Sequence, residues 1–334
     1  MRTNGLFDLQ VNGFAGVDFN DPAITPKALD HALEAMLTTG VTGCLPTLIT
    51  AHEAELGDRF RALDTAVHGS RLGPVMVPGY HLEGPFLNDA PGYRGCHPPG
   101  AMIDPDVALV ARLDAVIRKP ILLVTLAPER SGGQRAVADL VHAGKTVAIG
   151  HSAAGHDEVR MAADAGATLS THLGNGLPPH LPKLENTVLA QLAEPRLHAC
   201  LIADGHHMSP AALSALIRLK GAGSCILVTD AVLAAAAAPG PYRFAGMDVV
   251  LDETGKVAQP GSGVLAGSAL RLDQAVRNAV DWNIADADLA IRMAGDHALK
   301  ALGFALKHSG ISFDRGQVEW NTALEPHVIR PSAA

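Results

Sequence analysis

The sequence has no hydrophobic run long enough to cross a membrane and no excess of basic residues. No apolar stretch reaches the ~18 residues that a membrane helix needs, and the N-terminus MRTNGLFDLQVNG turns polar before an apolar signal-peptide core could form. Lysine and arginine number 26 against 34 aspartates and glutamates, a formal net charge of −8. A mildly acidic chain lacks the broad positive surface of a nucleic-acid-binding protein. We therefore expect neither a membrane nor a nucleic-acid partner.

Cysteine is also scarce. The four cysteines, Cys44, Cys96, Cys200 and Cys225, lie far apart and form no CxxC pair. This spacing predicts reduced thiols in a cytoplasmic protein rather than a disulfide framework. Apolar residues make up 48% of the chain, which is a globular composition. The 16 histidines are an unusually large number and direct attention to a metal site.

Short apolar runs alternate with segments of helical period along the chain. Eight runs end in polar or glycine-rich turns: Leu6–Val11, Gly40–Pro46, Val75–His81, Ile121–Leu126, Thr146–Ile149, Thr168–Thr171, Ala199–Ala203 and Cys225–Val228. Between and after them, helices are predicted over Ala28–Thr38, Glu53–Val67, Gly133–Ala143, Glu158–Ala165, Leu184–Ala193, Pro210–Leu219 and Ala269–Trp282. Alternation of this kind predicts parallel βα units. An open sheet fits the count, but a closed (β/α)8 barrel of the α/β class is the simpler match to count and length.

Two segments fall outside the barrel pattern. Residues 242–264 contain strand-like pieces around turns and are predicted to be a β insertion, and Ile311–Ile329 is predicted to form one or two strands. We therefore divide the chain into a barrel over residues 1–306, which includes the insertion, and a C-terminal β segment over 307–334.

Titratable residues follow the apolar runs, where a barrel carries its chemistry. Glu83, His151 and His172 come directly after the third, fifth and sixth runs, and Asp230 comes after the eighth. One carboxylate and two imidazoles suit Zn²⁺ or a similar divalent ion, with a fourth position open for water. A carboxylate such as Asp230 beside that water can act as general base. Each residue alone could be structural, since a buried histidine or an N-capping aspartate is common, but the four together favour a site.

The chain resembles the amidohydrolase superfamily, and within it the N-acetylglucosamine-6-phosphate deacetylases. The resemblance is carried by the segments DLQVNGFAGVDFND (8–21), GVTGCLPTL (40–48), HLEGPFLN (81–88), GYRGCHPPG (92–100), TLAPE (125–129), GHSAA (150–154), THLGNGL (171–177), IADGHHMSP (202–210), LVTDA (227–231) and GVLAGSALRLDQAVRNAV (263–280). It implies one divalent metal, zinc or else iron, manganese or cobalt, bound by Glu83, His151 and His172, with Asp230 as general base and then acid. Relatives with His-x-His after the first strand bind a second metal, but this chain has Gln10 and Asn12 there.

The resemblance also implies a set of substrate contacts. His97 is expected to bind the carbonyl oxygen and His207 the sugar; the remaining implied contacts are Cys96, Asn175, Gly176, Lys183, Leu265, Ala266 and Gly267. Lys183 stands where the family has a phosphate-binding arginine that often reaches into a neighbouring subunit, and Arg94 is a second candidate for the phosphate. A homodimer is therefore expected.

The chain departs from the family at its N-terminus. Members of the family carry a longer segment before the first barrel strand, and it forms half of a small β-sandwich with the C-terminus. The present sequence begins almost at that strand, which predicts a reduced β-subdomain or a displaced start. We expect the C-terminal piece Gln317–Ile329 to find its strand partners in the insertion or in another subunit.

The sequence thus predicts hydrolysis of an N-acetyl amino sugar, foremost N-acetylglucosamine 6-phosphate, to the free amine and acetate. Two alternatives stay open: a deacylase of the same mechanism acting on another N-acyl substrate, and a non-catalytic binding protein derived from the barrel.

Overall fold

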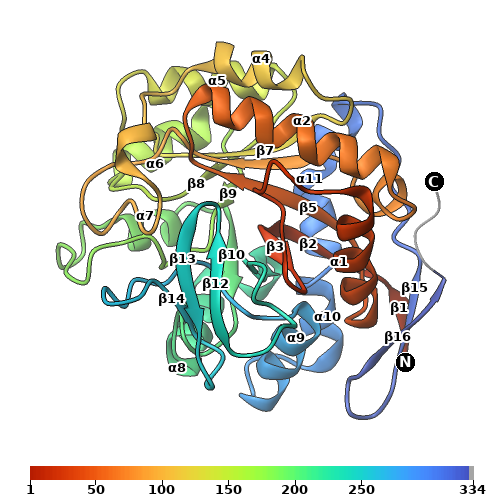
Figure 1. The fold of residues 1–334 in the computed structure, drawn as a ribbon. Coiled ribbons are helices and arrows are strands. Elements are labelled where there is room, and N and C mark those ends of the chain that lie inside the picture. Colours follow the sequence, from red (N-terminus) through yellow and green to blue (C-terminus); the bar gives the residue numbers. More distant parts are fainter. Residues whose placement is uncertain (331–334) are drawn as a thin grey trace.

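The computed structural model describes residues 1–330, and eight parallel strands form its centre. They follow one another around the sheet in chain order (Figure 1): β2 Leu6–Val11, β5 Val41–Ile49, β6 Tyr80–Glu83, β7 Ile121–Leu126, β8 Thr146–Ile149, β9 Leu169–Ser170, β10 His198–Ile202 and β11 Cys225–Val228. The predicted (β/α)8 architecture is confirmed. These strands are buried along almost their whole length, as expected of a parallel sheet covered by helices.

A few hydrogen bonds between the carboxyl ends of the first and last strands close the barrel. The amide of Asp230 donates to the carbonyl of Gln10 at 2.9 Å, and that of Asn12 donates to Ala231 at 2.7 Å. Below them, the Thr229 hydroxyl donates to the Asp8 carboxylate at 2.5 Å. Burial raises the pKa of Asp8 to about 7. A buried carboxyl group thus joins the first and last strands directly beneath the mouth of the barrel.

Helices surround the barrel between the strands. They are α1 Pro26–Thr38, α2 Glu53–Gly69, α4 Val107–Asp114, α5 Gly133–His142, α6 His156–Asp164, α7 Thr187–Ala193, α8 Pro210–Lys220 and α9 Leu272–Asp281, with short turns α3 Gly73–Met76, η1 Pro99–Ala101 and η2 Ala222–Ser224. Ser209 caps α8, because its side chain accepts from the amide of Ala212 at 3.2 Å and Pro210 follows it.

The third strand, predicted over Val75–His81, begins later in the structure than the sequence suggested. Ser70 accepts from the amide of Gly73 at 2.9 Å, and Pro74 has the fixed φ of a first helical turn. Residues Gly73–Met76 therefore form α3, and β6 begins only at Tyr80.

Two helices after α9 lie beyond the predicted set, α10 Ala287–Met293 and α11 Asp296–His308. Helix α11 contacts β2, β7, β8 and β11 (Figure 1), and its His297 Nδ1 lies 2.8 Å from the carbonyl oxygen of Cys225 at the start of β11. Its buried stripe is Ala298, Leu302, Ala305 and Leu306. The helix closes the amino-terminal end of the barrel, which leaves the carboxyl end as the accessible mouth.

Three small sheets accompany the barrel. The insertion forms β12 Gly240–Phe244, β13 Met247–Leu251 and β14 Val257–Ala258, as expected, and β3 Gly13–Phe14 pairs with β4 Val17–Asp18. The C-terminal strand β15 Gln317–Trp320 lies between β1 Arg2–Asn4 and β16 Pro326–Arg330 and pairs antiparallel with both. The expectation that the insertion or another subunit supplies the partner of the C-terminal strands is wrong, because the N-terminal strand does so. Residues 331–334 of the predicted C-terminal segment lie outside the described residues.

Within residues 1–330, no helix combines the length and the apolarity required to span a bilayer.

Trp320 fixes the contact between the two ends of the chain. It is 2% exposed, and its indole N–H donates to Thr3 Oγ1 at 2.9 Å. We predict that Trp320→Ala lowers the free energy of unfolding by about 3–5 kcal/mol, as expected for loss of a buried ring. Trp320→Phe, which keeps an aromatic ring but loses the N–H, should cost about 1 kcal/mol. Urea unfolding followed by circular dichroism measures both, and equal losses would show that ring packing does not anchor these strands.

Candidate active site

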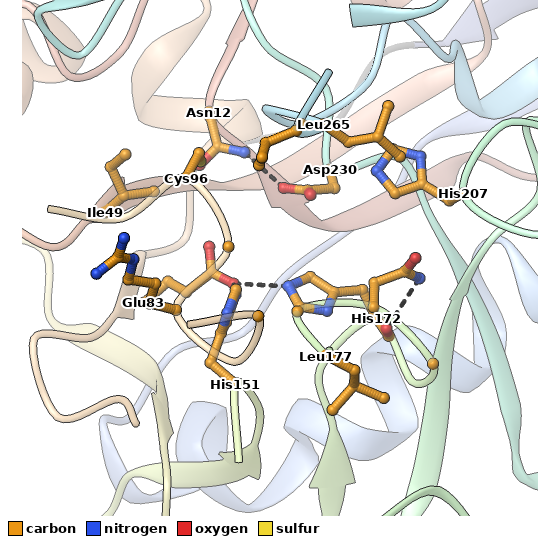
Figure 2. Close-up of a pocket in the computed structure, with 18 of the residues that line it drawn as sticks. Asn12, Ile49, Glu83, Cys96, His151, His172, Leu177, His207, Asp230 and Leu265 are labelled. Atoms are coloured by element: carbon orange, nitrogen blue, oxygen red, sulfur yellow. Dashed lines mark hydrogen bonds and ion pairs between the residues drawn. The ribbon is translucent and has the colours of Figure 1, made fainter. Parts of the chain in front are cut away.

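A cavity of about 530 Å³ opens at the carboxyl end of the barrel. Glu83, His151, His172 and Asp230 all line it, from the ends of β6, β8, β9 and β11 (Figure 2). The structure therefore brings together the four residues that the sequence pattern selected. Phe244 of the insertion closes another side of the same cavity.

The carboxylate of Glu83 is the centre of the site. It is 2% exposed, and its Oε1 lies 3.0 Å from His172 Nε2 and 3.5 Å from His151 Nε2. The Gln10 amide donates to the same oxygen at 3.1 Å. Although burial opposes ionisation, the contacts with His151 and His172 hold the pKa of Glu83 well below its usual value. The site thus contains a buried, ionised carboxylate facing imidazole nitrogens.

A third imidazole, that of His97, approaches Glu83 from the loop after β6. Its Nε2 lies 4.0 Å from Glu83 Oε2, and its Nδ1 is 2.8 Å from Thr50 Oγ1. Burial and the neighbouring His151 lower the pKa of His97 to about 3, so the ring is neutral. Ligand atoms of Glu83, His97 and His151 all lie within 4.8 Å of one another. His97 therefore belongs to the carboxylate–imidazole cluster in addition to the predicted His172, and its ring contacts that of His151.

The candidate ligand atoms, and the contacts that orient them, fit a divalent metal ion. His151 Nδ1 lies 2.7 Å from the carbonyl oxygen of Tyr93, a contact that leaves Nε2 with its lone pair toward Glu83. His172 Nδ1 is buried and has no hydrogen-bond partner within residues 1–330. One carboxylate oxygen and imidazole nitrogens in a cavity are the ligand types of catalytic zinc sites. The cluster could therefore hold a metal ion.

Asp230 lies across the cavity from these histidines. Its Oδ1 accepts a hydrogen bond from Asn12 Nδ2 at 2.8 Å (Figure 2). The same oxygen also accepts from Gln10 Nε2 at 3.0 Å. Burial and the negative charge of Glu83 raise the pKa of Asp230 to about 6. The side chain is thus a carboxyl group that can exchange a proton near neutral pH.

His207 forms the wall beside Asp230. Its Nδ1 lies 2.6 Å from Asp204 Oδ2. Burial alone would raise the pKa of Asp204, but the hydrogen bonds from His207 and from nearby amides lower it. An ionised aspartate therefore orients the His207 ring, whose Nε2 has no hydrogen-bond partner within residues 1–330. Asp204 is a supporting residue that the sequence analysis did not assign.

Most of the other predicted contacts reach the cavity. Cys96, Asn175, Gly176, Leu265 and Gly267 line it. Ala266 is fully buried between two of them and is not part of the lining. A side chain at Gly176 would place its Cβ 2.5 Å from His151 Nδ1, and the residue has a φ of +61°, so both the close approach and the backbone conformation require glycine.

The two candidate cations differ in position. Lys183 is exposed on the loop before α7 and does not line the cavity, whereas Arg94 does. Within one subunit, the structure does not bring Lys183 into the site.

Thr50 and the Tyr93 carbonyl were also missed by the sequence analysis. Thr50 follows β5 directly, so the rule that strand ends carry function could have found it. A backbone carbonyl leaves no signal in the residue type.

Known proteins resemble the chain in both sequence and structure, although no protein-family model matches it. An N-acetylgalactosamine-6-phosphate deacetylase of Escherichia coli O157:H7 is 37% identical over 297 residues, which cover 89% of this chain and 76% of that protein. An N-acetylglucosamine-6-phosphate deacetylase of Lysinibacillus sphaericus is 33% identical over 278 residues, covering 82% and 69%. A solved structure of a mutant N-acetyl-D-glucosamine-6-phosphate deacetylase from Mycobacterium smegmatis, in complex with N-acetyl-D-glucosamine-6-phosphate, matches with a TM-score of 0.87 and 30% identity, over 99% of this chain and 86% of that one.

The cluster around Glu83 contains one imidazole more than the predicted ligand set. His172 Nε2 lies nearer to the carboxylate than His97 Nε2, at 3.0 Å against 4.0 Å. We predict that His172→Asn lowers zinc affinity by more than the ~10–100-fold that loss of a supporting contact costs, and that His97→Asn keeps one ion per chain. Metal analysis after dialysis against a weak chelator measures this. Loss of the ion from the His97 variant alone would assign the site to Glu83, His97 and His151.

Proposed function

The chain belongs to the N-acetylglucosamine-6-phosphate deacetylase family of the amidohydrolase superfamily, and from this premise we propose that it hydrolyses N-acetylglucosamine 6-phosphate to glucosamine 6-phosphate and acetate. The observation that carries the proposal is the pairing of Glu83, set among imidazoles, with Asp230 in one cavity. The first provides a metal site and the second a proton carrier, which are the two parts that metal-assisted amide hydrolysis needs.

The proposed ligands are Glu83, His151 and His172, and the proposed ion is zinc. A divalent ion held there supplies Lewis-acid chemistry, which lowers the pKa of water and polarises a carbonyl group. His97 lies beside Glu83 with a neutral ring and a fixed Nδ1 contact, and it is proposed to orient the acetamide carbonyl oxygen.

Asp230 is proposed to move the proton. Its carboxylate takes a proton from the attacking water as the oxygen bonds to the acetyl carbon. It then gives that proton to the nitrogen as the C–N bond breaks, so that acetate and a free amine leave. The hydrogen bonds from Gln10 and Asn12 to Oδ1 leave Oδ2 for this transfer.

The sugar is proposed to lie between His207 and the lining segments. His207 offers its free Nε2, and Cys96, Asn175, Gly176, Leu265 and Gly267 supply the surrounding surface. Ala266 supports the loop from below. The expected homodimer and the cytoplasmic location stay predictions.

N-acetylgalactosamine 6-phosphate is a second candidate substrate. The Escherichia coli relative named for it is 37% identical to this chain, above the 33% of the Lysinibacillus protein named for the glucosamine sugar. The two sugars differ only in the orientation of one hydroxyl group, so the same site chemistry serves both.

Amine release from zinc-loaded protein tests the proposal. N-acetylglucosamine 6-phosphate should react fastest, and N-acetylgalactosamine 6-phosphate and unphosphorylated N-acetylglucosamine are the comparison substrates. Faster reaction of the galactosamine sugar would select the second candidate. Absence of turnover with all three, despite one bound ion per chain, would leave a deacylase for another N-acyl compound. Absence of both ion and turnover would favour a binding protein.

Asp230→Asn tests the proton step. The amide is isosteric and can still accept from Gln10 and Asn12, but it cannot take up a proton. We predict a fall in kcat of about 10²–10⁴-fold, with one metal ion still bound per chain and little change in the unfolding midpoint. Steady-state kinetics with metal analysis on the same preparation measures this, and turnover within tenfold of the wild type would remove Asp230 from the mechanism.

A further inference from the structure

Arg94 is an unpaired cation in the wall of the cavity. Among the residues that line the cavity in the described chain, it is the one arginine or lysine. It is partly buried, and its guanidinium has neither an ion pair nor a hydrogen bond to any residue in 1–330. Most other arginines of the described chain bind a carboxylate, as Arg59 binds Glu55 and Arg277 binds Asp273. A guanidinium left without a partner in a binding cavity is available for an anionic ligand.

The loop that carries Arg94 packs against the loop after β9. A Cβ at Gly92 would lie 2.5 Å from Pro178 Cα, and one at Gly95 would lie 3.0 Å from His151 Cε1. The opposite loop approaches the same ring through Gly176. Arg94 and the segment Asn175–Leu177 therefore belong to two loops that meet over His151.

The second loop contributes two backbone amides without an acceptor to the lining of the cavity. Gly176 and Leu177 both line it, and neither amide N–H has an acceptor within residues 1–330. Free amides beside a guanidinium form an anion site, since both donate hydrogen bonds and the arginine adds charge. The carboxylates Glu83 and Asp230 line the same cavity and are buried, whereas Arg94 and the two loop residues are partly exposed, so the carboxylates repel an anion from the metal site. The anionic end of a ligand is therefore directed to the loops.

We propose that Arg94 binds the phosphate group of the substrate, together with the amides of Gly176 and Leu177, in place of Lys183. The inference rests on the proposed function and adds to it the residue that sets the preference for a phosphorylated sugar. It also makes the phosphate site complete within one subunit, because Arg94 and both amides come from the same chain as the cavity.

The test compares Arg94→Met and Arg94→Lys with the wild type on N-acetylglucosamine 6-phosphate and on N-acetylglucosamine. Arg94→Met should lower kcat/KM for the phosphorylated sugar by ~10–100-fold, chiefly through KM, and should lower it far less for the neutral sugar. Arg94→Lys should recover part of the loss, since lysine keeps the charge without the two-pronged geometry. Arg135→Met is the matched control, because Arg135 is an exposed arginine of α5 with 87% of its side chain accessible.

Two outcomes would overturn the proposal. One is an Arg94→Met enzyme that keeps the wild-type preference for the phosphorylated sugar. The other is a loss of that preference in Lys183→Met instead, which would place the phosphate on the exposed loop or in a contact between subunits. In both cases wild-type turnover of the phosphorylated sugar leaves the proposed function intact.

A second measurement does not depend on turnover. Glucose 6-phosphate carries the phosphate but no acetamide, so its binding by calorimetry reports the phosphate contact alone. Binding that is ~10–100-fold weaker in Arg94→Met than in the wild type supports the assignment even if no N-acetyl sugar reacts. Equal binding by the two proteins would contradict it.

Discussion

The buried carboxylate of Glu83 is the constraint on which the rest of the site depends. An ionised group in the interior is costly unless charged or polar partners surround it. Here the partners come from separate strands: Gln10 from β2, His151 after β8 and His172 after β9. One side chain of β6 therefore restricts the register of strands on both sides of the barrel. The carboxylate concentrates nitrogen ligands at a single point, which is the arrangement that a divalent ion requires.

The backbone is strained where these partners leave their strands. His151, His172 and Asp230 have φ values of +51°, +27° and +50°, in the region that residues other than glycine avoid. Such conformations cost about 1–3 kcal/mol each and persist only where the surroundings hold them. In this barrel the turn follows immediately on a buried strand, and it places each side chain in the mouth. Three of the eight non-glycine residues with positive φ in the described chain are therefore residues of this cluster.

The barrel and the central residues could be predicted from the sequence because both depend on local pattern. Buried parallel strands are apolar runs, and residues directly after them must lie at the mouth. Features that depend on contacts distant in sequence could not be predicted. The pairing of Arg2–Asn4 with Gln317–Trp320 joins the two ends of the chain. No sequence pattern in either segment indicates that it pairs with the other. The positions of His97, Arg94 and Lys183 depend on how two long loops pack. Gly92 and Pro178 form a close contact between these loops, and the sequence alone does not indicate it.

The side-chain amide of Gln10 binds both carboxylates of the site. Its Nε2 carries two hydrogens, and it donates to Glu83 Oε1 at 3.1 Å and to Asp230 Oδ1 at 3.0 Å. The amide is neutral, so it holds both groups in place without cancelling the repulsion between them. Imidazole contacts keep the pKa of Glu83 low, while burial and that repulsion raise the pKa of Asp230 to about 6. Two carboxyl groups whose pKa values are pushed apart suit different roles, here the proposed ones of a metal-binding anion and a proton carrier. The amides of Gln10 and Asn12 both donate to Oδ1 of Asp230, so its Oδ2 remains available for the proton exchange that we propose.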